Sequence, residues 1–88
     1  MESWTNKKVG ETLDYSLDWK YRLPANDTIN SSSWSVTANL TISANTFSSK
    51  RTTVWLSGGT ANNYANVTNT IVTTQGRTFI ESVVLKII

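Results

Sequence analysis

The sequence has no cysteine and no histidine among its 88 residues. Without cysteine there are no disulfide bridges, thiolate metal sites or thiol nucleophiles. Without histidine the chain lacks the usual general base at neutral pH and the commonest protein ligand for metals. These absences exclude most catalytic constellations. The sequence therefore predicts a protein that is not an enzyme, and it singles out no residue as a metal ligand.

Charged residues and long apolar segments are also scarce. Charged residues make up 16% of the chain, and the formal net charge is only +2. The basic pairs Lys7-Lys8 and Lys50-Arg51 indicate solvated turns rather than a nucleic-acid interface. No apolar run approaches the ~20 residues that span a bilayer, and residues 1–10 lack the apolar core of a secretory signal. We therefore expect neither a nucleic-acid nor a membrane partner.

The few carboxylates are poorly placed for chemistry. Asp14 and Asp18 share one face of a predicted strand, and four residues of strand separate their Cα atoms by about 13 Å. That separation is too large for a shared proton or for the paired carboxylates of glycoside hydrolysis. A calcium site would need Asp27 or Glu81 to fold in beside them. The simpler interpretation is that these carboxylates keep a strand face soluble.

Polar residues of the strand and turn type are abundant. Threonine, serine and asparagine make up roughly two-fifths of the chain, well above average usage. Apolar and polar residues alternate along most of it, which is the period of a half-buried strand. The inward faces are predicted to carry Leu13, Tyr15, Leu17 and Trp19; Trp34, Val36 and Ala38; Leu40 and Ile42; Val54 and Leu56; Val67 and Ile71; and Phe79, Val83, Leu85 and Ile87.

Turn residues separate these segments at short intervals. Residues 22–27, the bend at Asn39, Gly58-Gly59 and Gln75-Gly76 punctuate the pattern. Phe47 marks a further short strand or a turn anchor. Short strands with turns every 8–12 residues predict an all-β, immunoglobulin-like antiparallel β-sandwich of about seven strands, with a small barrel as the alternative. We expect one domain over residues 1–88, with residues 1–10 as an N-terminal arm.

The chain has four tryptophans. Trp19 and Trp34 lie on inward faces, and Trp34 is the candidate for the central core tryptophan of a sandwich. Trp55 points away from its inward neighbours, and Trp4 lies in the polar arm. Trp4 and Trp55 are therefore candidate interface anchors. Either ring could also stack on a sugar.

The last strand is apolar on both faces. Ile80, Val84 and Ile88 lie opposite the inward residues of the same strand. A strand that is apolar on both sides needs cover on both sides, which a small two-layer domain cannot supply alone. Ile80, Val84 and Ile88 are therefore candidate contacts for a second protein, and the free hydrogen-bonding groups of such a strand can pair with a partner strand.

Four segments, taken in order, suggest a family. The segments are Leu13–Trp19, Trp34–Val36, Thr53–Thr60 and Thr70–Thr78. The third contains a Trp-Leu-Ser-Gly-Gly turn at 55–59, and the fourth contains a Gln-Gly-Arg-Thr hairpin at 75–78. Together they resemble the phage fiber-tail adaptor proteins, small Ig-like virion proteins encoded among tail and baseplate genes. The resemblance covers about Val9 to Ile88.

This resemblance implies a structural virion protein that connects receptor-binding tail fibers to the phage tail or baseplate. It implies protein contacts, several copies per virion, and neither catalysis nor a cofactor. Such a protein is made in the host cytoplasm and ends in the phage tail. Two alternatives remain at this stage: an Ig-like module that binds carbohydrate or a cell surface, and a head-decoration or neck protein of the phage.

Overall fold

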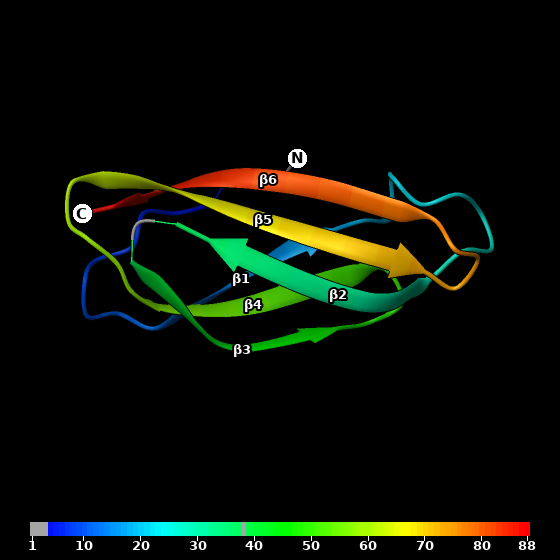
Figure 1. Ribbon diagram of the computed structural model, residues 1–88, viewed down its shortest axis with the longest axis horizontal. Helices are drawn as coiled ribbons and strands as arrows, with labels where there is room; N and C mark the ends of the chain where they lie inside the picture. The colour runs from blue at the N-terminus through cyan, green and yellow to red at the C-terminus, as the bar shows by residue number, and fades with distance from the viewer. Residues whose placement is uncertain (1–3, 38) are drawn as a thin grey trace.

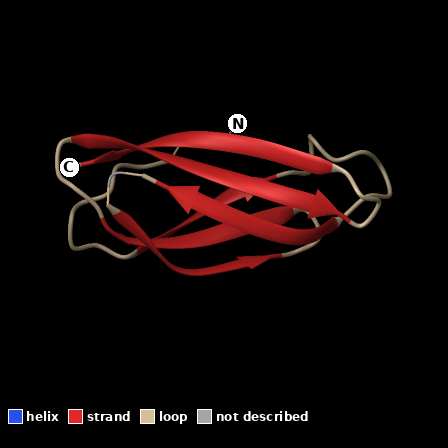
Figure 2. Ribbon diagram, in the orientation of Figure 1, coloured by secondary structure: helices blue, strands red, loops and turns tan. Residues whose placement is uncertain are grey.

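Strands are the only regular elements in the part of the chain that the structure describes, residues 4–37 and 39–88. The computed structural model has six (Figures 1 and 2). They are β1 (Leu13–Asp18), β2 (Ile29–Val36), β3 (Leu40–Phe47), β4 (Arg51–Gly58), β5 (Asn63–Thr73) and β6 (Thr78–Ile87). The all-β prediction is confirmed. About seven strands were predicted, and the described residues form six. The N-terminal arm adds an isolated bridge to β6.

The six strands form two antiparallel sheets of three strands each. One has the order β1-β4-β3 and the other the order β2-β5-β6. The sheets lie face to face as two layers (Figure 1), and buried side chains from both, such as Leu56 and Val67, pack between them. The molecule is long and narrow, 41 × 21 × 15 Å. None of its described residues forms a helix long and apolar enough to cross a membrane.

The core follows the predicted alternation. Val54 and Leu56 of β4 are fully buried, whereas Trp55 between them remains 40% exposed. Val67 and Ile71 of β5 are also fully buried. The same alternation holds in β6, whose inward residues Val83, Leu85 and Ile87 are buried. Of the predicted inward residues, Ala38 lies outside the described part of the chain.

Turns and bulges set where the strands end. Asn39 has a positive φ of 60°, which confirms the predicted bend. Asparagine tolerates this left-handed conformation better than most residues. Phe47, predicted to mark a short strand, ends the eight-residue β3, which was longer than its polar sequence suggested. A bulge between Ile42 and Ala44 accounts for the irregular face of that strand.

A polar network crosses the core. Asn69 of β5 is fully buried between apolar neighbours, and all four hydrogen-bonding positions of its amide are used. Its Oδ1 accepts from Trp19 Nε1 at 3.2 Å and from Thr52 Oγ1 at 2.7 Å. Its Nδ2 donates to Ser32 Oγ at 2.9 Å and to the Ser33 carbonyl at 2.8 Å. The network thus joins both sheets and aligns them.

The central core tryptophan is Trp19, so the choice of Trp34 was wrong. Trp19 is 1% exposed and its Nε1 donates to Thr52 Oγ1 at 3.0 Å. Trp34 is only half-buried, and its Nε1 is buried without a hydrogen-bond partner in the described part of the chain. Both side chains point inward as predicted. The indole N–H of Trp19 finds acceptors in the polar network, whereas the indole N–H of Trp34 does not reach that network.

This difference predicts losses of stability of different size when each tryptophan is replaced by phenylalanine. We expect Trp19→Phe to lower the free energy of unfolding by about 2–3 kcal/mol, because Asn69 and Thr52 lose a buried donor. We expect Trp34→Phe to cost less than about 1 kcal/mol, because the lost ring area is offset by removal of an unpaired N–H. Urea denaturation measures both. Equal losses in the two variants would contradict this account.

The N-terminal arm is hydrogen-bonded to the rest of the sandwich around Lys7. The Lys7 amide donates to the Lys86 carbonyl at 3.0 Å, and the Ile88 amide donates to the Lys7 carbonyl at 2.8 Å. The Lys7 side chain is fully buried, and its Nζ donates to the carbonyls of Lys8 at 2.9 Å and Gly58 at 2.8 Å. Burial lowers the pKa of Lys7, and the Glu11 carboxylate partly offsets this effect. The arm is therefore held to β6 and to the end of β4.

Candidate protein interface

Trp4 packs within the chain more than its polar surroundings suggested. Its ring stacks on Tyr15 with centroids 4.7 Å apart and lies 6.3 Å from the ring of Trp34. Its Nε1 donates to the Ser16 carbonyl at 3.2 Å. The Tyr15 hydroxyl in turn donates to the Thr5 carbonyl at 3.2 Å. Trp4 is half-buried and serves first to dock the arm on β1.

Trp55 lies on the outer face of the sheet β1-β4-β3. It occupies the middle strand, where its register partners are Asp14 on β1 and Ala44 on β3. Its side chain is 40% exposed, as the alternation predicts. The neighbouring outward positions on β1 are Asp14, Ser16 and Asp18. Trp55 is thus the large apolar side chain on a polar and partly acidic surface, and we call this surface the Trp55 face.

The other predicted contact residues lie on the opposite outer face, along β6. Ile80 and Val84 are each 59% exposed and Ile88 is 43% exposed. Their side chains alternate with Ser82 and Lys86, and together these five residues form what we call the outer β6 row. The row lies at one edge of the sheet β2-β5-β6 (Figure 1). The structure therefore brings three of the five predicted contact residues onto one strand and places Trp4 and Trp55 elsewhere.

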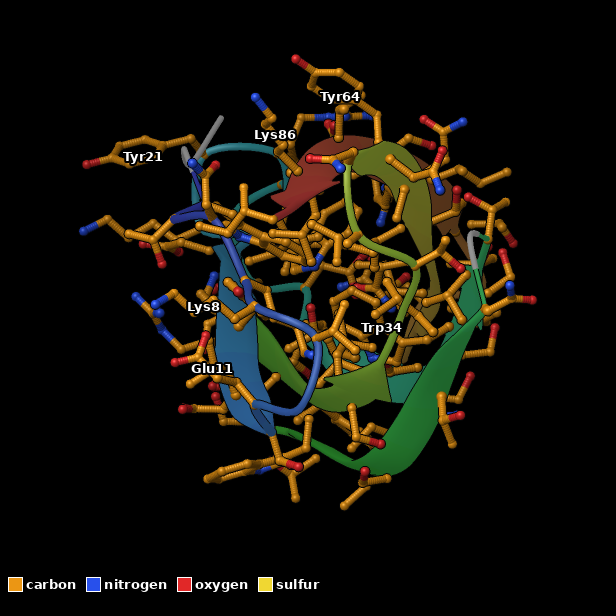
Figure 3. All side chains as sticks on the ribbon, turned by 90° about the vertical axis from the view of Figure 1, so that its left-hand side faces the viewer. Lys8, Glu11, Tyr21, Trp34, Tyr64 and Lys86 are labelled. Carbon is orange, nitrogen blue, oxygen red and sulfur yellow. The ribbon has the colours of Figure 1, made fainter. Side chains whose placement is uncertain are left out.

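Tyr64 extends this row, although sequence reasoning did not single it out. It pairs with Lys86 across the β5-β6 ladder and is 65% exposed. The Lys86 ammonium lies 5.7 Å from the centroid of the Tyr64 ring, and both side chains project outward in Figure 3, whereas Trp34 lies inside. The period-2 alternation could have predicted this exposure, because Tyr64 is an odd number of positions (three) from the inward-facing Val67 and therefore faces outward.

The carboxylates that a calcium site would have required are held apart in ion pairs. Asp27 is fully buried and pairs with Arg77 at 2.9 Å, while Glu81 pairs with Arg22. Burial raises the pKa of Asp27, but hydrogen bonds from Thr73, Arg77, Thr28 and Thr74 more than offset this effect, so the pKa lies below its usual value. Among the described residues no three acidic, histidine or cysteine side chains form a metal-binding group.

The fold and these surfaces define a small β-sandwich protein with exposed apolar side chains on each of its two outer faces, Trp55 on one and Ile80 and Val84 on the other. Such side chains typically mark contacts with other proteins. The chain belongs to the family of the podophage GP4 fiber-tail adaptor protein gp77, whose model matches residues 7–86. No individual curated protein matches the chain. The resemblance to the phage fiber-tail adaptors is thereby confirmed, and with it a structural role in the phage tail.

Proposed function

We propose that this protein connects receptor-binding fibers to the tail or baseplate of the phage through two separate protein contacts. Membership in the fiber-tail adaptor family supports the role. The observation that carries the proposal is the placement of exposed apolar side chains on opposite outer faces of the sandwich. A connector needs two such surfaces, because it must hold two partners at once. We assign the Trp55 face to the tail and the outer β6 row to the fiber.

We propose further that the sandwich is of the immunoglobulin-like type. In that fold, strands B, E and D share one sheet and strands C, F and G share the other. Taking β1 to β6 as B to G reproduces both sheet orders, β1-β4-β3 and β2-β5-β6. The arm, which bridges β6 in parallel at Lys7 and Ile87, then occupies the place of a first strand.

Trp55→Glu tests the tail contact. We expect the free energy of unfolding to change by no more than about 0.5 kcal/mol, because the side chain already faces solvent. We expect the amount of this protein in purified particles to fall at least about tenfold, since a central interface tryptophan typically contributes 2 kcal/mol or more. The measurement complements phage that lack the gene with a plasmid copy and quantifies the protein by mass spectrometry. Tyr21→Glu is the matched control, because Tyr21 is an 85% exposed aromatic on a loop outside both surfaces.

The double variant Ile80→Lys and Val84→Lys tests the fiber contact in the same particles. We expect normal amounts of the variant protein and a loss of fibers, because only the second surface is altered. Particles with full fibers and normal adaptor content in both the Trp55 and the double variant would overturn the proposed function. Loss of head proteins instead of fibers would favour a head-decoration or neck role. A carbohydrate-binding role finds little support, because Trp55 and Tyr64 lie on different sheets and form no shared aromatic platform.

A further inference from the structure

Within residues 4–37 and 39–88, the edge of β6 that faces away from β5 carries backbone groups that bond to no other residue. The arm shows which groups these are, because the Lys86 carbonyl and the Ile88 amide bond to Lys7 on that side. The Ile87 carbonyl points the other way and accepts from the Asn62 amide at 2.8 Å. Backbone direction alternates along a strand. The amides and carbonyls of Ile80, Ser82 and Val84 therefore point outward from the sheet edge.

These six groups have no partner within residues 4–37 and 39–88. The ladder of β6 is made with β5 alone, and the single bridge to the arm is at Ile87. The three residues that present the groups are exposed, and Ile80 and Val84 are each 59% exposed. Unpaired edges of this kind are templates for an added strand. Native proteins protect such edges with lysine, proline or bulges, and the stretch Thr78–Val84 has none of these.

We propose that this free edge binds an extended segment of the fiber protein, which adds to the sheet as an antiparallel strand beside β6. The inference rests on the proposed function and identifies how its fiber contact is made. Antiparallel pairing is favoured because it is the more stable arrangement per residue. Main-chain hydrogen bonds supply affinity in this mode, and side chains at alternate positions supply specificity.

The structure sets the length and register of the segment. The bridge at Lys7 ends the free edge on one side, and the turn before Thr78 ends it on the other. The site therefore takes up to about seven residues, opposite Thr78–Val84. The residue opposite Ser82 would lie between Ile80 and Val84, within diagonal contact of both. An aliphatic side chain fits that position.

The charges at the site define one end of the segment. Arg22 and Arg77, the cations nearest the start of β6, are already paired with Glu81 and Asp27. Lys86 makes no ion pair with any described residue, and its ammonium lies 5.7 Å from the centroid of the Tyr64 ring. Because the bound segment runs antiparallel to β6, its N-terminal end lies near the C-terminal end of β6. A carboxylate near its N-terminal end would therefore pair with Lys86.

Ser82→Pro tests this inference against Ser82→Ala. Both changes remove the hydroxyl that lies 2.9 Å from Thr68 Oγ1. Only proline also removes the Ser82 amide from the free edge, and the β5 ladder keeps its bonds because that amide points away from β5. In particles made as above, we expect normal adaptor content for both variants. We expect at least tenfold fewer fibers with Ser82→Pro and normal fibers with Ser82→Ala.

The outcomes separate this inference from the proposed function. If Ser82→Pro particles carry normal fibers and particles with the double variant Ile80→Lys and Val84→Lys lose them, edge pairing is overturned but the fiber contact stands. Normal fibers in both would overturn both. Hydrogen exchange of the unaltered protein provides a second test if Ser82→Pro fails to fold. The amides of Ile80, Ser82 and Val84 should exchange quickly in the free protein and at least tenfold more slowly when it is bound to purified fiber protein. Unchanged exchange rates in the complex would overturn the inference.

Discussion

Replacing Asn69 with leucine is expected to lower the free energy of unfolding by about 3 kcal/mol, which is a fall in Tm of roughly 15 °C for a domain of this size. Leucine has a similar volume but cannot bond to Thr52, Ser33 or Trp19. The Thr52 hydroxyl then loses its acceptor and the Ser33 carbonyl loses a donor, each within the core. Leaving such buried groups unpaired costs about 1–3 kcal/mol each, more than the added apolar contact returns. Urea and thermal denaturation would measure the loss.

Asn66→Leu is the matched control for this prediction. Asn66 lies on the same strand but faces solvent. Its backbone bonds to Thr37, through the amide to Thr37 Oγ1 at 2.8 Å and through the carbonyl from the Thr37 amide at 3.2 Å, but its side chain makes no hydrogen bond with any described residue. We expect its stability to change by no more than about 0.5 kcal/mol. If both leucine variants were equally stable, the buried network would have no special role in holding the two sheets in register.

Gly59→Ala is expected to lower the free energy of unfolding by about 3 kcal/mol, for two reasons that add. Gly59 has a φ of 105°, where an alanine is strained by roughly 1–3 kcal/mol. A Cβ there would lie 2.7 Å from Ile87 Cδ1 and 3.2 Å from Leu40 Cδ2. Ile87 is fully buried and Leu40 is nearly so, so neither can move aside cheaply. The same denaturation experiments measure the effect.

Gly76→Ala separates the strain from the packing. Gly76 also has a positive φ, 86°, but a Cβ at this turn would meet nothing within 4 Å. We expect a loss of about 1 kcal/mol from backbone strain alone. If Gly59→Ala is as stable as Gly76→Ala, the close contact with Ile87 must relax, and the packing argument is contradicted.

Much of the fold could be predicted because one face of each strand is buried. Alternation alone assigned Val54 and Leu56 inward and Trp55 outward, and the structure confirms all three. The same rule put Ile80 and Val84 on the outside of β6, where they are exposed. Local chemistry also identified the turn at Gly76 and the bend at Asn39. These features depend only on residues that are neighbours in the sequence, so the local sequence pattern is enough to predict them.

The errors arose where distant residues decide the outcome. Asn69 is a buried polar residue between the inward-facing Val67 and Ile71. Its partners are Ser32 and Ser33 of β2, Thr52 of β4, and Trp19, which directly follows β1. The choice between Trp19 and Trp34 as the central core residue depended on which indole could reach that network.

The sequence by itself determined that this is an all-β, cysteine-free and histidine-free protein, which side of most strands faces the core, and, through its ordered segments, the adaptor family to which it belongs. Only the tertiary structure decided which strands pair, where the buried polar groups find partners, and that Trp55 and the outer β6 row lie on opposite faces. Among the described residues, it also leaves one edge of β6 without a partner strand beside the exposed side chains of Ile80 and Val84. The physical reason is that alternation is a local property, whereas hydrogen-bond satisfaction and free edges depend on contacts between residues far apart in the chain.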